Sequence, residues 1–217
     1  MSRLNVDAVA YAADYPAEEQ EFKKKFYLDS VSSEPVFDIL ITEYTFAECQ
    51  QRELNLGLDL KGGMNVIDIG AAPGSWSQYV SKIVKSGKIV SVDLKEMEEI
   101  INTIQIKGDF TEESIQDEIK KHMSTKVNVV MSDMAVNTTG IKNIDSIQTG
   151  ELCIEAMLFS KNLLKGNGFF ISKIFMGGTF NEIVAEGKKY FKEVKVFKPK
   201  SSRKDSKESF IICRKLR

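Results

Sequence analysis

Three charged residues stand where strands of an alternating sequence begin or end, and their types suit proton handling. Asp133 follows the apolar run VVMS, Lys173 lies in ISKIF, and Glu208 precedes the apolar run SFIIC. Each charge alone is typical of an exposed strand end. At neighbouring strand ends, however, two carboxylates and one ammonium predict either a buried ion-pair network or a catalytic centre.

A glycine-rich turn follows the apolar run MNVIDI. Its sequence, DIGAAPGSW, starts at Asp68 and has small residues that let the backbone approach a ligand closely. Gly70 and Gly74 have the spacing Gly-x-x-x-Gly, whereas dinucleotide-binding turns have Gly-x-Gly-x-x-Gly and hold a pyrophosphate. A cofactor without phosphate therefore fits better. S-adenosylmethionine is such a cofactor, and its ammonium and sulfonium groups favour an acidic neighbour such as Asp68.

Two further acids are placed to bind a nucleoside. Asp93 ends the second expected strand, where its carboxylate would accept both hydroxyls of an adenosine ribose. Asp109 follows Lys107-Gly108 and precedes Phe110, so it would bond the adenine amine beside an aromatic ring. The alternative is that the glycines only make a tight turn and the acids are surface loop residues. The turn and both acids together favour the nucleoside site.

Strand and helix patterns alternate from residue 64 onward. The expected strands are Met64–Ile69, Lys88–Asp93, Thr103–Ile106, Val127–Ser132, Phe169–Phe175, Glu193–Phe197 and Ser209–Cys213. The expected helices run from the glycine turn to Lys85, onward from Thr111, over Ser146–Lys165 until Gly166-Asn167-Gly168, and over Phe180–Tyr190. This alternation predicts an α/β domain with a mostly parallel sheet buried on both faces.

The sheet explains why the charged residues stand where they do. Ligands of such sheets bind at the carboxyl ends of the strands, near the point where the strand order reverses. The connection over residues 198–203 is too short for a helical crossover, so the last two strands should be antiparallel. Residues 61–217 are expected to form this domain, and residues 1–60 a divergent, partly helical N-terminal extension.

Composition limits the function further. A chain of 217 residues with 42% hydrophobic content can bury one sizeable core. No apolar run approaches the roughly 20 residues of a membrane span, and the N-terminus lacks a hydrophobic signal core. The three cysteines and the single histidine have no metal-ligand spacing, so we expect no metal site and reduced thiols. We therefore expect a cytoplasmic protein that is not bound to a membrane.

The net charge of −1 hides an asymmetry. Between Lys188 and Arg217 the chain has twelve Lys or Arg and three Asp or Glu, a local charge of +9 that leaves −10 for the rest. A basic end on a near-neutral protein is typical of a surface that binds a polyanion. A solvated, lysine-rich strand and tail is the alternative that charge alone leaves open.

Four segments follow one another between Lys61 and Arg214: DIGAAPGSWSQYV, VVMSDMAVNTTG, SKIFMGG and KPKSSRKDSKESF. In their sequences, order and spacing they resemble the FtsJ/RrmJ family of rRNA ribose 2′-O-methyltransferases. The resemblance implies a Rossmann-like methyltransferase fold of about seven strands that uses S-adenosylmethionine without a metal. It also implies cofactor contacts from Gly74, Trp76, Asp93, Asp109 and Asp133.

The resemblance implies a reaction centre as well. Lys173 would be the catalytic base, supported by Glu208. The substrate would be a uridine ribose of large-subunit rRNA. We expect the protein to be a monomer that binds this RNA through its basic C-terminal region. Because a sulfonium methyl is already a strong electrophile, the enzyme has mainly to align the 2′-oxygen and remove its proton. We expect Lys173 to orient the hydroxyl and to accept the proton late.

One part of the family pattern has no match. The family's first catalytic lysine comes from a helix before the first strand, and its spacing leads here to Cys49, with Arg52 one turn later. Val136 stands where the family usually has Pro, and Phe210 where Tyr is common. Two alternatives therefore stay open: a 2′-O-methyltransferase of tRNA or cap, or a non-catalytic homologue that binds the cofactor or RNA. A dehydrogenase lacks the required glycine spacing.

Overall fold

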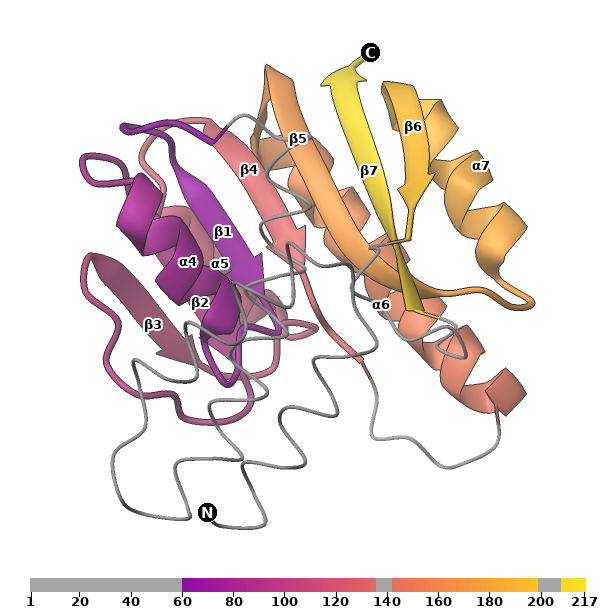
Figure 1. Ribbon diagram of the computed structural model, residues 1–217, viewed down its shortest axis with the longest axis horizontal. Helices are drawn as coiled ribbons and strands as arrows, with labels where there is room; N and C mark the ends of the chain where they lie inside the picture. Colours follow the sequence, from indigo (N-terminus) through magenta and orange to yellow (C-terminus); the bar gives the residue numbers. More distant parts are fainter. Residues whose placement is uncertain (1–59, 136–141, 199–207) are drawn as a thin grey trace, which may run out of the picture.

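The computed structural model describes residues 60–135, 142–198 and 208–217 of the chain. Within these ranges, seven strands form one sheet (Figure 1). The strands are β1 (Val66–Ile69), β2 (Ile89–Asp93), β3 (Thr103–Lys107), β4 (Val127–Ser132), β5 (Leu164–Phe175), β6 (Phe191–Phe197) and β7 (Glu208–Leu216). The helices are α4 (Ser75–Ile83), α5 (Glu113–His122), α6 (Lys142–Leu163) and α7 (Phe180–Tyr190).

The strand order is β3-β2-β1-β4-β5-β7-β6. Neighbouring strands are parallel except in the two pairs that include β7. The expected mostly parallel α/β sheet and the antiparallel final pair are thus confirmed. Because β7 runs against its neighbours, it begins at the edge of the sheet where the parallel strands end. Glu208 therefore lies at the same edge as the carboxyl ends of β1, β4 and β5.

Two apolar clusters show that the sheet is covered on both faces. On one face, Trp76 and Val80 of α4 pack against Val66, Ile89 and Val129 of the sheet. On the other face, helices α5, α6 and α7 supply buried side chains that include Ile119, Ala156, Met157 and Ile183. All four residues of β1 are buried, as expected for a central strand whose sequence reads as one apolar run.

The boundary between α6 and β5 differs from the prediction. The helix was expected over Ser146–Lys165, but it spans Lys142–Leu163, and β5 begins directly at Leu164. The segment Gly166-Asn167-Gly168 does not end the helix. It lies in an irregular part of the β4–β5 ladder, where Val127 pairs with Leu164 and Val129 with Phe169. The glycines therefore accommodate extra residues inside a strand.

The strand order reverses beside β1, which has β2 on one side and β4 on the other. The β1–α4 turn and the residue after β4 consequently lie next to each other at one edge of the sheet. This is the position at which α/β sheets bind ligands. None of the helices in the described ranges is both long and apolar enough to cross a membrane.

Candidate active site

The β1–α4 turn is shaped by its glycines. Gly70 has φ +74° and Gly74 has φ +108°, both in the left-handed region that favours glycine. The amides of Gly70 and Ala71 donate to the carbonyl of Val92, at 2.9 and 3.1 Å. A Cβ atom on Gly70 would lie 2.8 Å from the backbone nitrogen of Met134. The turn therefore packs directly against the chain that leaves β4.

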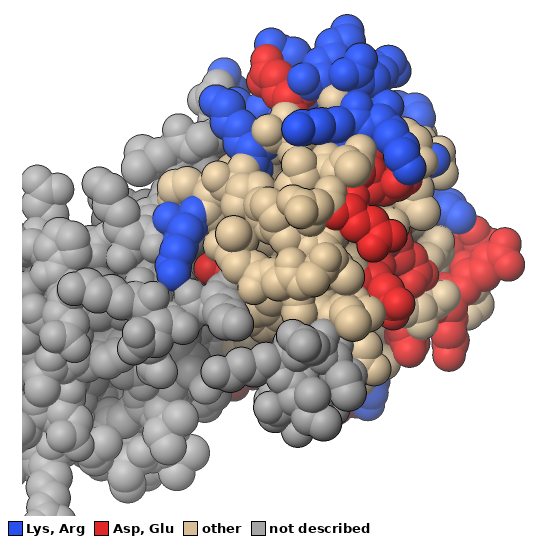
Figure 2. Space-filling model, turned by 90° about the vertical axis from the view of Figure 1, so that its right-hand side faces the viewer, with Lys and Arg blue, Asp and Glu red and all other residues tan. Residues whose placement is uncertain are grey.

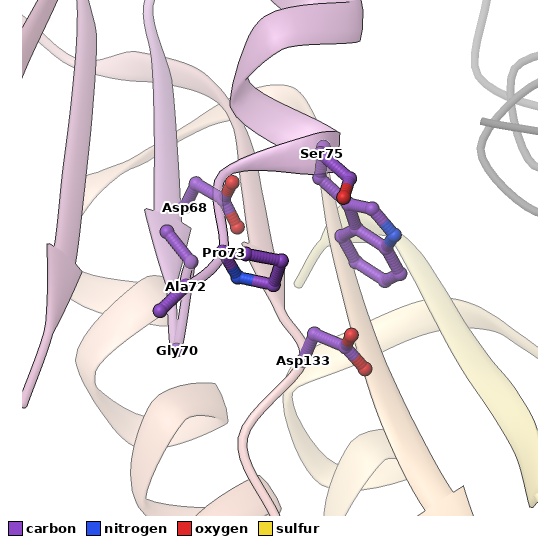
Figure 3. Close-up of a pocket in the computed structure, with 8 residues that line it drawn as sticks. Asp68, Gly70, Ala72, Pro73, Ser75 and Asp133 are labelled. Carbon is purple, nitrogen blue, oxygen red and sulfur yellow. The ribbon is translucent and has the colours of Figure 1, made fainter. Parts of the chain in front are cut away.

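A pocket opens under this turn. Its lining consists of Asp68, Gly70, Ala71, Ala72, Pro73, Ser75, Trp76 and Asp133. Figure 3 shows the carboxylates of Asp68 and Asp133 around the Pro73 ring, one from the end of β1 and the other from the residue after β4. The predicted residues Asp68, Gly70, Trp76 and Asp133 are thus brought together, whereas Gly74 lies in the turn itself.

Asp68 is fully buried. Its Oδ2 accepts a hydrogen bond from the hydroxyl of Ser77 at 2.6 Å, whereas its Oδ1 is buried and has no hydrogen-bond partner among the described residues. Burial raises the pKa of Asp68 to about 7, against the lowering effect of the Ser77 hydrogen bond, and the charges of Asp133 and Asp93 raise it further. An unpaired buried oxygen on the pocket wall can accept a hydrogen bond from a ligand or pair with a ligand cation.

Asp93, at the end of β2, braces the turn from the side. Its Oδ2 accepts the amide hydrogen of Ala72 at 3.0 Å, and its Oδ1 accepts that of Lys95 at 2.9 Å. Each carboxylate oxygen has about two acceptor positions, so both keep capacity for a ligand hydroxyl. The structure therefore fixes the orientation of this carboxylate while leaving it able to bind.

Asp109 and Phe110 follow β3 and do not line the pocket under the turn. The Oδ1 of Asp109 accepts hydrogen bonds from the amide and the hydroxyl of Thr111, at 2.9 and 2.7 Å. The ring of Phe110 is buried in the core, in an edge-on contact with Phe159 at a centroid distance of 5.1 Å. A contact of either residue with an adenine stays a prediction, and the packing of Phe110 gives its side chain a structural role.

Trp76 lies in the first turn of α4. Its ring is buried and packs against Phe210 of β7, with the ring centroids 5.6 Å apart. Its Nε1 is also buried without a hydrogen-bond partner among the described residues. Trp76 thus links the pocket wall to β7, and Phe210 fills its position with apolar contact.

Asp133 and Lys173 form an ion pair across two neighbouring strands. Ser132 of β4 is opposite Ser172 of β5, so the next residue of each strand lies beside the other. The Nζ atom of Lys173 is 2.8 Å from Oδ1 of Asp133 and donates to the Asp133 carbonyl at 3.1 Å. The Lys173 side chain is 13% exposed and that of Asp133 34% exposed. The pair is therefore open on the side of the carboxylate.

The neighbouring acids stabilise the charged form of Lys173. Burial lowers the pKa of Lys173, but the charge and hydrogen bond of Asp133 and the charge of Glu208 raise it, and the net shift is upward. In the antiparallel ladder Glu208 is opposite Phe175, and Phe210 is opposite Lys173. Because strand side chains alternate, Lys173 and Glu208 share one face of the sheet. The three predicted residues thus lie at one edge, with Lys173 between two acids.

Sequence reasoning missed Ser77 and Ser91. Their hydroxyl oxygens are 2.5 Å apart, and the bond from Ser77 joins them to Asp68. A usable signal was present, since Ser91 is the polar residue inside the apolar strand IVSVD and lies opposite Asp68 in the ladder. A buried serine that faces a buried carboxylate across two strands indicates a hydrogen-bonded network.

The described residues contain no group of three or more His, Cys, Asp or Glu placed to hold a metal ion. The segment around Cys49 and Arg52, where the family's first catalytic lysine was sought, and Val136 lie outside the described residues. The chemistry that this site offers is thus a carboxylate-lined pocket beside a lysine–carboxylate pair.

Solved structures share the fold of this chain. A structure described as a ribosomal RNA methyltransferase from Plasmodium falciparum superposes with a TM-score of 0.69 at 25% identity, covering 78% of this chain and 96% of that one. The fold is also that of a SAM-dependent O-methyltransferase from Thermotoga maritima, with a TM-score of 0.55 at 16% identity over 77% of this chain and 65% of that one.

Curated relatives are more similar in sequence. The protein named ribosomal RNA large subunit methyltransferase E from Pelagibacter ubique is 70% identical over 157 residues, 72% of this chain and 77% of its own. The protein of the same name from Rickettsia akari is 46% identical over 156 residues, 69% of each chain. The model of the FtsJ-like methyltransferases matches residues 48–216. With most of its length matched, the chain belongs to the FtsJ-like methyltransferase family.

Proposed function

We propose that the protein transfers a methyl group from S-adenosylmethionine to a ribose 2′-hydroxyl of large-subunit ribosomal RNA. The observation that carries the proposal is the ion pair between Lys173 and Asp133, 2.8 Å long, whose carboxylate also lines the pocket under the glycine-rich turn. The names of the similar Pelagibacter and Rickettsia proteins support the choice of RNA. A uridine is the nucleoside expected from the family, and a cytoplasmic monomer the expected form.

The pocket fits S-adenosylmethionine. The unpaired Oδ1 of Asp68 suits the ammonium group, and the small side chains of the turn admit the methionine part of the cofactor. Asp93, held by two backbone amides, would accept the ribose hydroxyls. Asp109 would accept the adenine amine through Oδ2, because Thr111 occupies Oδ1. The cofactor would then extend across the ends of β1, β2 and β3, with Trp76 and Gly74 at its methionine end.

The reaction would take place between this pocket and Lys173. The bound cofactor supplies an electrophilic methyl group, so the protein has to align the attacking oxygen and remove its proton. Lys173, held by Oδ1 and the carbonyl of Asp133, would fix the 2′-oxygen by a hydrogen bond. The raised pKa of Lys173 keeps it mostly cationic, so only the small neutral fraction accepts the proton. Glu208 would hold Lys173 at this strand edge.

Mapping of ribose methylation tests the proposal. Large-subunit rRNA from cells that lack the protein should gain one 2′-O-methyl group when the purified protein and S-adenosylmethionine are added to the ribosomal subunit. Methylation of tRNA or of a capped RNA instead would support the first alternative. Cofactor binding without transfer to any of these RNAs would support the non-catalytic homologue. That alternative is considered because the family's first catalytic lysine has no match in this sequence.

Basic residues of the C-terminal region lie at the two opposite ends of strand β6. Lys188 lies in the last turn of α7 and Lys192 is the second residue of β6, next to the point where the amide of Arg217 donates to the carbonyl of Tyr190. Figure 2 shows Lys and Arg gathered at this end of the α7–β6 side, next to a band of Asp and Glu. Lys198 follows the opposite end of β6, whose Phe197 pairs with Phe210 beside Lys173. Residues 199–207, with Arg203, lie outside the described residues.

We therefore expect RNA to contact the Lys198 end of the region. A Lys198→Ala/Arg203→Ala variant should bind a substrate RNA hairpin severalfold more weakly, and the slope of log affinity against log salt should shrink by about 1 to 2 because two phosphate contacts are lost. The matched control is Lys188→Ala/Lys192→Ala, which removes the same charge at the far edge. Equal losses in both variants, or an unchanged slope in the first, would contradict the assignment.

A further inference from the structure

A chain of three buried groups runs from β2 through α4 to the pocket. Ser91, Ser77 and Asp68 are all fully buried. The hydroxyl oxygens of Ser91 and Ser77 are 2.5 Å apart, and the Ser77 hydroxyl lies 2.6 Å from Oδ2 of Asp68. A serine hydroxyl has one proton. Because Ser77 donates its proton to Asp68, Ser91 must donate to Ser77, and both hydroxyls point their hydrogens toward the carboxyl group.

Within residues 60–135, 142–198 and 208–217, the groups that act on Asp68 are two acids and a neutral hydroxyl, none of the opposite charge. From β2 it faces the acid Asp93, from the end of β4 the acid Asp133, and from α4 the neutral Ser77. The nearby cation, Lys173 on β5, is bound to Asp133. Burial and the two acids act in the same direction, and the pKa of Asp68 is raised to about 7. Without a ligand, Asp68 therefore carries a proton in a large share of the molecules at neutral pH.

We propose that binding of the cofactor expels a proton from Asp68, and that the Ser91–Ser77 pair sets how readily this proton leaves. The inference rests on the proposed function, in which the cofactor ammonium lies at Oδ1. The O–H bond of the carboxyl group breaks, the proton passes to solvent, and a carboxylate–ammonium pair replaces it. The demethylated product keeps the ammonium group, so the proton returns only when the product leaves. Each turnover thus couples cofactor exchange to the loss and return of at most one proton, and the share of molecules that exchange it falls as pH rises through the Asp68 pKa of about 7.

Calorimetric titration in two buffers of different ionisation enthalpy measures this proton directly. For the whole chain and S-adenosylmethionine we expect release of about 0.9 proton at pH 6, falling to about 0.2 at pH 7.5, from a group that titrates near 7. The Asp68→Asn variant corrects for protons exchanged by the cofactor and by other groups, because its amide does not ionise. The wild type minus this variant should give the share of released protons that comes from Asp68, and the variant should bind the cofactor with an affinity that hardly changes over this range.

The serine variants separate a tuning role from a structural one. Ser77→Ala removes the hydrogen bond that lowers the Asp68 pKa, so the midpoint of the affinity–pH curve should rise by about one pH unit. Ser91→Ala should raise it less, because it acts through Ser77. Ser160→Ala is the matched control, a buried serine of α6 that donates to the carbonyl of Met157. It should leave the midpoint unchanged even if the fold is less stable.

Two results would overturn the inference. One is cofactor binding at pH 6 with no more proton release than in Asp68→Asn. The other is a loss of affinity in Ser77→Ala that is equal at every pH. Either result leaves the proposed function intact if rRNA is still methylated, whereas failure of the cofactor to bind at all removes both.

Discussion

A Lys173→Ala variant is expected to lose methyl transfer by roughly 10³-fold while its affinity for the cofactor changes less than about threefold. Lys173 reaches the pocket only through Asp133, which it holds at 2.8 Å, so the cofactor should still find its carboxylates in place. The 2′-hydroxyl, by contrast, would lose both the group that orients it and the group that takes its proton. Single-turnover transfer to the ribosomal subunit, with separate cofactor titration, measures the two effects.

Two controls make this result interpretable. Lys173→Met keeps the length of the side chain without its charge, and it should be as inactive as the alanine variant. Lys161→Ala removes a lysine whose Nζ lies 4.0 Å from the centre of the Tyr190 ring, away from the pocket, and should retain the full rate. Residual turnover above about a tenth of wild type in Lys173→Ala would remove this residue from the mechanism.

The rate should also depend on pH through the same residue. Because the pKa of Lys173 is raised above its usual value near 10.5, the neutral amine is scarce at pH 7 and increases with pH. Where chemistry limits the rate, kcat should therefore rise about tenfold per pH unit between pH 7 and 9. The residual rate of Lys173→Ala should not show this rise. A flat wild-type profile would mean that Lys173 orients the hydroxyl and that another group takes the proton.

Gly70→Ala is expected to lower the free energy of unfolding by about 3 kcal/mol or more. The new Cβ would lie 2.7 Å from Cγ, 2.8 Å from the nitrogen and 2.9 Å from Cα of Met134, and backbone atoms cannot yield as a flexible side chain can. The φ of +74° adds strain for any residue with a Cβ. Because Met134 follows Asp133, the displacement should weaken cofactor binding as well.

Gly63→Ala is a matched control for this substitution. Gly63 also has a positive φ, +80°, but its Cβ would meet only Oγ of Ser86, at 3.5 Å. It should therefore cost about 1 kcal/mol, from backbone strain alone, and leave cofactor binding unchanged. Denaturant unfolding of both variants measures the difference. Similar losses in the free energy of unfolding of the two variants would show that the close contact between Gly70 and Met134 does not determine the cost of Gly70→Ala.

Periodicity and turn residues were enough to predict most of the fold. The central strands are continuous apolar runs, and such runs remain strands in almost any parallel sheet, so β1, β2 and β4 were found within about two residues. The segment Gly166-Asn167-Gly168 was misread because the glycines of a helix end and those of an irregular strand look alike in sequence. The pairing of β4 with β5 decides between them, and it depends on the partner strand.

Parts of the candidate site could be predicted where a single residue is unusual in its sequence context. Asp133, Lys173 and Glu208 were selected because a charge next to an apolar run is conspicuous, and the sheet brings them to one end of neighbouring strands, whereas their roles in catalysis stay a prediction. Ser77 and Ser91 were missed because serine is ordinary in sequence. Their role depends on the lateral register that sets Ser91 opposite Asp68. Distances between strands, and therefore buried networks, are properties of the assembled sheet.

The point where the strand order reverses also separates, along the sequence, the residues proposed to bind the cofactor from those proposed to act on the acceptor. Asp68, Asp93 and Asp109, assigned to the cofactor, come from the half of the sheet that contains β1, β2 and β3. Lys173 and Glu208, proposed to act on the acceptor hydroxyl, come from the half that contains β4, β5 and β7. Asp133 follows β4, the strand of this half that pairs with β1. Changes confined to the contiguous stretch from β4 onward would thus alter the groups proposed for the acceptor and leave those proposed for the cofactor in place. A chimera joined between β3 and β4 would be the natural way to redirect such a methyltransferase.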